Sequence, residues 1–510
     1  MRRAWPLFAA LVAAAALLDL GAIHRLEHGD SLVPVLVSLQ RWTPFYWDQE
    51  RFGMLLPLLA LPVRDPLWNL LLQRGLMILA GLSTVVLLAR HLFAGRDWPL
   101  VGAAAAATLL IFAPEPWRFE FLGDQPYGLA LALALAGLAF AEPAPGADPN
   151  DPQPTARRAR WRIAVGLLLV LLAHLVNPAT GVVLGLLALG RALEDWFTEP
   201  IEARGAIRER LLVDAGLLAA GLTAGQLSIM LYPVITGNPL LLAVGFLPVS
   251  QWPSAWVTTV ARAWAEAPGW GWALLGCSGL GGALMLLPTS RGWRRDALLR
   301  AGMLLVAALA YAAFAGALAW VAENQHHPRY LAPAAVLLHL AVISLLAEPL
   351  ARAVRASGPA FVAALIALPL AALAVGGAPS LAGVRADLDG RAGRLTEDVL
   401  AARCQLIAGD YWSVWPAVWH ASLVARERGL RDEGGDGPRR VWGVSHRATP
   451  TVAQWKGIPV ESLRVCRVRG EEPEREAERW LRAYHAWPVR VVERRATVDV
   501  LELSRDGGGL

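Results

Sequence analysis

Long apolar stretches separated by short polar segments run through the first 380 residues of the chain. A helix that crosses a bilayer needs roughly 20 predominantly apolar residues. By that length the pattern predicts about eleven crossings, at 5–20, 69–91, 99–114, 126–142, 162–176, 179–195, 211–233, 269–288, 298–322, 330–350 and 359–378. We therefore expect a mainly α-helical, polytopic membrane domain over residues 1–380.

From residue 381 the pattern changes to short apolar runs among charged residues and glycines. Runs at 488–492 and 497–503 are typical of strands, whereas 391–408 and 473–486 repeat at helical spacing. Residues 381–510 are numerous enough for a small core of their own. We therefore expect a soluble C-terminal α/β domain.

Composition and charge refine this picture. The 510 residues are 55% hydrophobic and the mean hydropathy is +0.42, which together exclude an ordinary soluble globule. Because short cytoplasmic loops are enriched in basic residues, arginines in alternate loops place the N-terminus in the cytoplasm and the C-terminal domain outside. We expect a multi-pass protein of a bacterial inner membrane, with no nucleic acid as partner. The loop arginines are Arg90, Arg96, Arg157, Arg158, Arg160, Arg162, Arg204, Arg208, Arg210, Arg291, Arg294, Arg295, Arg352 and Arg355.

Two acids beside predicted crossings are candidates for proton transfer. Asp30 follows the first crossing, in a first external loop at about 25–68, where an ionised carboxylate can accept a proton from a hydroxyl group. Asp30 also suits the N-cap of a helix over 31–40. Asp124, between the third and fourth crossings, is either a functional acid or a solvated loop residue.

The segment 45–53 mixes charged residues with aromatic rings. Such a mixture suits a sugar-binding surface, although aromatic residues also anchor proteins at the membrane interface. Pro57 and Pro62 then predict a broken or interfacial helix over 53–65. The candidate residues of this segment are Tyr46, Trp47, Asp48, Glu50 and Arg51.

A polar cluster between the ninth and tenth crossings contains His326, His327, Arg329 and Tyr330. Polar groups this close to a bilayer are costly unless they line water or bind a headgroup. The guanidinium fork of Arg329 suits phosphate, and its alternative role is to snorkel to the interface. The adjacent histidines do not match zinc-ligand spacing, so we predict no metal site and no cofactor, and a divalent-metal requirement stays open.

Two features of the C-terminal domain leave alternatives open. The aromatic residues of 411–419 either belong to the core, bind an acceptor glycan or dock onto the membrane surface. Cys404 and Cys466 are both in the predicted exported domain, where an oxidising compartment would permit a disulfide, but sequence alone does not supply the geometry.

Together, several of these elements resemble GT-C glycosyltransferases, a superfamily that includes protein O-mannosyltransferases and lipid-A-modifying transferases. The resemblance is carried by Gly29-Asp30-Ser31 after the first crossing, the stretch 46–53, Arg329-Tyr330-Leu331-Ala332-Pro333 and the exported C-terminal domain. It implies transfer of a sugar, with inversion, from a polyprenyl-phosphate donor to an acceptor glycan, lipid or protein at the outer membrane face.

The resemblance also implies roles for single residues. Asp30 would be the general base; the family often carries a second acid beside it, and here that neighbour is Ser31, so Asp48, Glu50 and Asp124 remain rivals. Independently of the resemblance, the chemistry of a phosphate leaving group assigns charge stabilisation to Arg329, assisted by His326 or His327. We expect substrate contacts from Tyr46, Trp47, Arg51 and Tyr330. One alternative is a transporter or flippase for a lipid or lipid-linked glycan, which performs no bond chemistry. Another is a noncatalytic envelope-assembly protein whose exported domain recruits partners.

Overall fold

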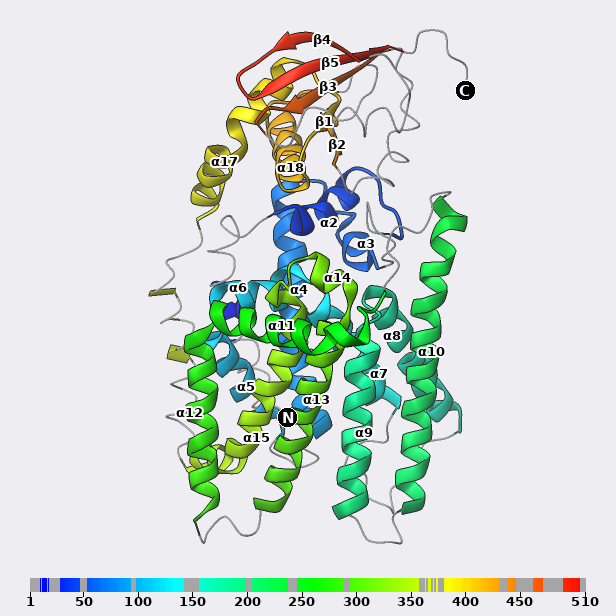
Figure 1. Cartoon of the computed structure of the whole chain (residues 1–510), viewed down its shortest axis with the longest axis vertical. Helices are drawn as coiled ribbons and strands as arrows, with labels where there is room; N and C mark the ends of the chain where they lie inside the picture. The colour runs from blue at the N-terminus through cyan, green and yellow to red at the C-terminus, as the bar shows by residue number, and fades with distance from the viewer. Residues whose placement is uncertain are drawn as a thin grey trace. The chain divides into compact units, whose positions relative to one another are not determined.

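The computed structural model divides the chain into two compact units (Figure 1). Unit 1 comprises Met1–Asp19, Met77–Ser228 and Ala243–Gly377, and unit 2 comprises Leu20–Leu76, Ile229–Leu242 and Ala378–Leu510. The structure describes residues 28–45, 53–92, 98–141, 156–198, 204–236, 245–287, 294–356, 380–431, 439–445, 462–470 and 489–504, with isolated positions within 10–17 and 363–374.

Unit 1 is built from helices. Its elements are α5 (Trp98–Phe112), α6 (Glu115–Arg118), the π-helix η1 (Phe119–Asp124), α7 (Tyr127–Ala141), α8 (Ala156–Val176), α9 (Thr180–Thr198), the 3₁₀ helix η3 (Val249–Gln251), α11 (Trp252–Glu266), α12 (Pro268–Met285), α13 (Arg294–Ala317), α14 (Ala319–Glu323), the 3₁₀ helix η5 (Pro328–Leu331) and α15 (Ala332–Ala356). The helices α4 (Pro66–Leu92) and α10 (Arg204–Thr236) carry residues of both units.

Among the described residues, four helical segments are long and apolar enough to cross a membrane, which indicates a membrane protein. They are Pro66–Leu92, Leu211–Ile235, Arg294–Ala317 and Pro328–Ala347, at the predicted positions 69–91, 211–233, 298–322 and 330–350. Helices α5 and α7 have 15 residues each, so each is roughly 22 Å long, shorter than a hydrocarbon core of roughly 30 Å. The segments 5–20 and 359–378 lie mostly outside the described residues, so the total of about eleven stays a prediction.

The crossing predicted at 298–322 is shorter than expected. Helix α13 ends at Ala317, and Leu318 has extended backbone angles before α14 begins. The backbone N–H of Leu247 donates to the Ala317 carbonyl at 2.8 Å, and that of Ala319 donates to the Gly245 carbonyl at 2.9 Å. This short pairing with the chain before α11 separates the apolar helix from the polar turn that follows α14.

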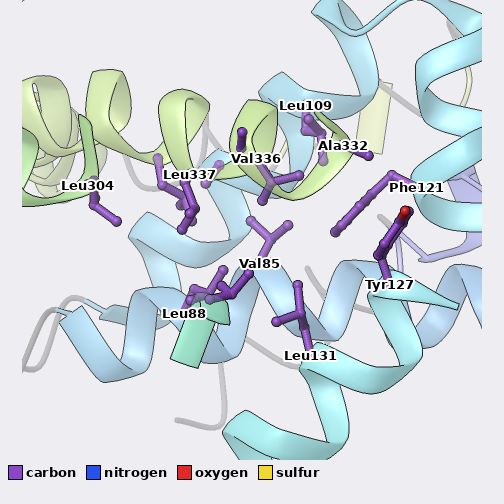
Figure 2. Close-up of a cluster of buried hydrophobic side chains, with 14 of the residues drawn as sticks. Val85, Leu88, Leu109, Phe121, Tyr127, Leu131, Leu304, Ala332, Val336 and Leu337 are labelled. Carbon is purple, nitrogen blue, oxygen red and sulfur yellow. The ribbon is translucent and has the colours of Figure 1, made fainter. Parts of the chain in front are cut away.

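The core of unit 1 is a cluster of apolar side chains from helices distant in sequence (Figure 2). Val85 of α4, Leu109 of α5, Phe121 of η1, Leu131 of α7 and Val336 of α15 are all buried in it. Burial of each such side chain contributes about 1.5–3 kcal/mol in water, and close packing takes over that role between helices in lipid. The cluster therefore fixes η1 and the start of α15, the two elements that carry the polar residues described below.

Unit 2 contains a small mixed sheet with helices. The helices are α2 (Gly29–Leu39), α3 (Leu55–Ala60), α17 (Leu381–Ala401) and α18 (Tyr411–Glu427), and the strands are β1 (Leu406–Ala408), β2 (Trp442–Val444), β3 (Ser462–Val468), β4 (Val489–Arg494) and β5 (Val498–Ser504). The strand order is β2-β1-β3-β5-β4, with β1 parallel to β2 and β3, and β5 antiparallel to β3 and β4. The predicted α/β character of the C-terminal region, its strands near 488–492 and 497–503, and the short helix within 53–65 are confirmed.

The helix predicted at 391–408 is wrong in its second half. Helix α17 ends at Ala401, Arg403 has a left-handed φ of 54°, and the chain then enters β1. Residues 406–408 are fully buried between two strands, so tertiary pairing overrides the helical spacing. The helical pattern at 473–486 lies outside the described residues.

A disulfide joins Cys404, which follows α17, to Cys466 of β3. Both cysteines are buried beside the core of unit 2. The bond links the helical layer to the middle of the sheet across a sequence separation of 62 residues. The open alternative at these two cysteines is therefore settled in favour of the bridge.

Candidate functional site

Unit 1 contains a cavity of about 330 Å³ with charged walls. Trp117 comes from α6, Glu120 from η1 and Glu266 from the last residue of α11. His327, Pro328 and Arg329 come from the turn that opens η5. Two carboxylates, one guanidinium and one imidazole thus share a small space with an indole ring.

Glu120 reaches the cavity from a π-helix. The wider turn is marked by the backbone N–H of Gln125 donating to the Glu120 carbonyl at 3.0 Å. Single π-helical turns inside α-helical structure occur frequently at functional sites. Sequence reasoning missed Glu120 as a site residue, because its neighbourhood was taken as an external loop.

Asp124 closes the same π-helix and is therefore not a loop residue. Its Oδ2 accepts a hydrogen bond of 2.7 Å from the Gln125 side chain. Glu120 and Asp124 each offer a carboxylate oxygen within 4.8 Å of the other. Oxygen ligands are those that Mg²⁺ and Ca²⁺ prefer, so this pair could supply part of a coordination shell.

Arg329 is held in the cavity wall by its immediate neighbours. Arg329 is only 9% exposed. One guanidinium nitrogen donates to the Tyr330 hydroxyl at 3.2 Å, and the guanidinium carbon lies 5.1 Å from the centre of that ring. The backbone N–H of Arg329 donates to Nδ1 of His327 at 3.3 Å. The predicted trio of His327, Arg329 and Tyr330 is therefore one local assembly.

The turn before Arg329 is fastened to α11. Gln325 and His326 both have left-handed φ values, 56° and 55°. The Gln325 carbonyl accepts a hydrogen bond from Arg262, and Nδ1 of His326 lies 2.9 Å from the Thr259 hydroxyl. Burial and the positive charge of Arg262 lower the pKa of His326. His326 thus contacts α11 and does not line the cavity.

Glu266 was not predicted as a site residue, because no element was assigned between the crossings at 211–233 and 269–288. That interval contains α11, of which Glu266 is the last residue. Burial raises the pKa of Glu266, although the nearby Arg262 acts in the opposite direction. Tryptophans at helical spacing, Trp252, Trp256 and Trp264, are the sequence signal that could have revealed this helix.

Asp30 lies in unit 2, in the first turn of α2. The N-cap of that helix is His28, so the capping role proposed for Asp30 is wrong. Asp30 is only 6% exposed, and its Oδ1 accepts a hydrogen bond of 2.7 Å from the Tyr411 hydroxyl at the start of α18. Its carboxylate is therefore a buried, hydrogen-bonded group of unit 2.

The aromatic residues of α18 divide into two groups. Tyr411, Trp415 and Trp419 are fully buried, as the core interpretation predicts. Trp412 is 41% exposed, so that interpretation fails for this ring. The rings of His28 and Tyr411 lie nearly perpendicular to it, with centroid distances of 5.3 and 5.0 Å. Trp412 is therefore a partly exposed aromatic ring packed beside Tyr411, the residue that donates to Asp30.

The predicted site residues separate as follows. His327 and Arg329 meet in the cavity of unit 1 with two carboxylates, while Asp124 and His326 lie next to residues that line it. Asp30 belongs to unit 2. The remaining candidates, Tyr46, Trp47, Asp48, Glu50 and Arg51, lie outside the described residues.

This arrangement can bind an anionic group and transfer a proton. A buried guanidinium offers paired donors to phosphate oxygens, and a carboxylate beside it can accept the proton of a hydroxyl group.

A comparison with protein-family models and a comparison with curated proteins gave no match to the chain.

Proposed function

We propose that the chain is an integral-membrane glycosyltransferase that moves a sugar from a polyprenyl-phosphate donor to an acceptor glycan, lipid or protein. The cavity of unit 1 carries this proposal. Arg329 lines it at the second residue of an apolar segment, Pro328–Ala347, that is long enough to cross a membrane. A phosphate attached to a hydrocarbon chain needs both of these surroundings at once.

In the proposed reaction an acceptor hydroxyl oxygen attacks the anomeric carbon of the donor sugar, and a carboxylate takes the hydroxyl proton. The bond between the anomeric carbon and the phosphate oxygen breaks, and the polyprenyl phosphate leaves with the electron pair. Arg329 stabilises the charge that develops on the phosphate. Attack opposite to the leaving group inverts the anomeric configuration.

By the resemblance to GT-C enzymes the general base is Asp30, which belongs to unit 2 and does not line this cavity. Glu120 and Glu266 are alternatives that the cavity adds, because both share its walls with Arg329. Asp124, Asp48 and Glu50 are further candidates of the same chemical type. Base catalysis supplies about 10²-fold to 10⁴-fold in rate. Replacement of the true base should therefore lower the transfer rate by about that factor.

The finer topology belongs to the same proposal. We infer about eleven crossings, a cytoplasmic N-terminus and a C-terminal region on the periplasmic side of a bacterial inner membrane. The alternation of arginines between loops supports this orientation. The disulfide between Cys404 and Cys466 supports it independently, because such bonds persist in oxidising compartments.

The test is a reconstituted transfer assay. Purified protein in liposomes is incubated with polyprenyl-phosphate sugars, and both release and transfer of the sugar are followed. We expect Arg329→Gln to lose about 10²-fold to 10³-fold in kcat, since it removes preorganised donors to the leaving group. Arg428→Gln is the matched control, because that side chain is half exposed and pairs with Glu397.

Three further variants, Asp30→Asn, Glu120→Gln and Glu266→Gln, assign the base within the same assay. The proposal is abandoned if no donor loses its sugar while the intact lipid crosses the bilayer in a protein-dependent way. That outcome would establish the transporter alternative.

A further inference from the structure

We propose that Tyr411 is a positioning residue for Asp30, so that the C-terminal part of unit 2 belongs to the catalytic machinery. This inference rests on the proposed function, in which Asp30 is the leading candidate for the general base. It adds a residue that lies 381 positions away along the chain. It also gives α18 a role beyond that of a core helix.

The first support is the hydrogen bond itself. The Tyr411 hydroxyl donates to Oδ1 of Asp30 at 2.7 Å, and both residues are buried. A hydrogen bond to a carboxylate is stronger than one between neutral groups, and shielding from water strengthens it further. The bond therefore holds the carboxylate in one orientation and favours its ionised form, which is the form that accepts a proton.

The second support is that the Tyr411 ring has little freedom to move. It is the first residue of α18, and the side chain of Asp410 caps that helix by accepting from the Trp412 N–H at 2.8 Å. The ring centroids of Trp412 and Trp415 lie 5.0 and 6.3 Å from the ring centroid of Tyr411. Two aromatic rings of the same helix thus fix the direction of the Tyr411 hydroxyl group.

The third support is the fit between Tyr411 and the residue before Asp30. A Cβ atom on Gly29 would lie 2.5 Å from Cε1 of Tyr411, closer than real Cβ contacts allow. The ring therefore rests directly on the backbone of Gly29. Any side chain at position 29 would force the ring, and with it the hydroxyl group, away from its present place.

The competing explanation is that this hydrogen bond only stabilises the packing of α2 against α18. The Tyr411→Phe variant distinguishes that stabilising role, called a staple below, from the positioning role. Phenylalanine keeps the ring and its packing but removes the hydroxyl. In the reconstituted transfer assay we expect kcat to fall about 10-fold to 100-fold, because a hydrogen bond to a charged group is lost, while KM changes little. We also expect the acidic limb of the kcat profile to move to higher pH.

Gly29→Ala is the second variant. It keeps the hydroxyl group but displaces the ring, so the same shift of the acidic limb is expected. Tyr311→Phe is the matched control, because that tyrosine is buried in α13 of unit 1. Among the described residues, His28 is the N-cap of α2 and Asp410 is the N-cap of α18, and both of these titratable groups are unchanged in every variant.

An activity-independent readout keeps this inference separate from the proposed function. The infrared difference between wild type and Asp30→Asn isolates the carboxylate band of Asp30, and its titration is followed with and without Tyr411→Phe. A shift of this titration to higher pH supports the pair even if no donor is ever turned over.

Two results would overturn the positioning role. One is an infrared titration of Asp30 that Tyr411→Phe leaves in place. The other is an active variant whose melting temperature falls while its pH profile stays that of wild type, because a staple alone predicts this. If wild type itself transfers no sugar, the proposed function fails on its own.

Discussion

His420 is a buried titratable residue of α18 whose side chain contacts residues of α17. Its Nε2 lies 2.9 Å from Oδ1 of Asp389, and its Nδ1 lies 2.8 Å from the Thr396 hydroxyl. A carboxylate can only accept, so Nε2 carries the proton and Nδ1 accepts from Thr396. Burial lowers the pKa of His420 from its ordinary 6.5, with a further contribution from Arg385, while Asp389 opposes the shift.

This lowered pKa predicts how stability depends on pH. Below about pH 6.5 the unfolded chain binds a proton at His420 that the folded protein does not, so the contribution is complete above that pH and is lost as the pH falls. The loss is at most about 1.4 kcal/mol per pH unit. Melting of wild type and His420→Gln between pH 7.5 and 5.5 measures it. Equal slopes for the two proteins would contradict the prediction.

At the scale of elements, α7 and α8 approach each other closely through glycine. A Cβ on Gly137 would lie 2.7 Å from the Gly166 carbonyl oxygen, and a Cβ on Gly166 would meet the Gly137 carbonyl at the same distance. Small residues at such crossings let helix backbones pack tightly where lipid removes the hydrophobic driving force.

We therefore expect Gly137→Ala to destabilise the protein by about 1–3 kcal/mol, the usual effect of overpacking. Gly276→Ala in α12 is the control, since a Cβ there meets nothing within 4 Å, and alanine there favours the helix by about 1 kcal/mol. Thermal melting in one detergent compares the two. The packing argument fails if Gly137→Ala melts at or above wild type.

Elements were predictable from sequence where one local signal dominates. The long apolar stretch at 69–91 became α4, and the strand-like run at 497–503 became β5. The prediction of a helix over 391–408 was wrong at its end, because residues 406–408 pair with β2 and β3 as a strand. Helix α11 was missed because its apolar residues cover one face only, and the length criterion for crossings does not detect that pattern.

At the scale of the whole molecule, the disulfide makes a prediction about compartment. Protein isolated without reductant should carry one reactive thiol after denaturation, that of Cys277, and three after reduction. Replacing Cys404 and Cys466 with alanine should cost about 2–5 kcal/mol of stability. Quantitative maleimide labelling and melting measure the two effects. Three thiols without reduction would contradict an exported C-terminal region.

The candidate site was predictable only in its local parts. His327, Arg329 and Tyr330 contact one another because they are neighbours in sequence. Glu266 joins Arg329 through folding. The pairing of Asp30 with Tyr411 spans 381 residues, and such separations leave no mark in a single sequence.

Unit 2 is assembled from three separated stretches of chain, and this orders events during synthesis. At about 5–20 residues per second, Tyr411 is made roughly 20 to 80 s after Asp30. Throughout that interval the nascent polypeptide already displays its acid but not the phenol that would orient it. A ribosome that stops before residue 411 thus leaves a product in which this hydrogen bond never forms.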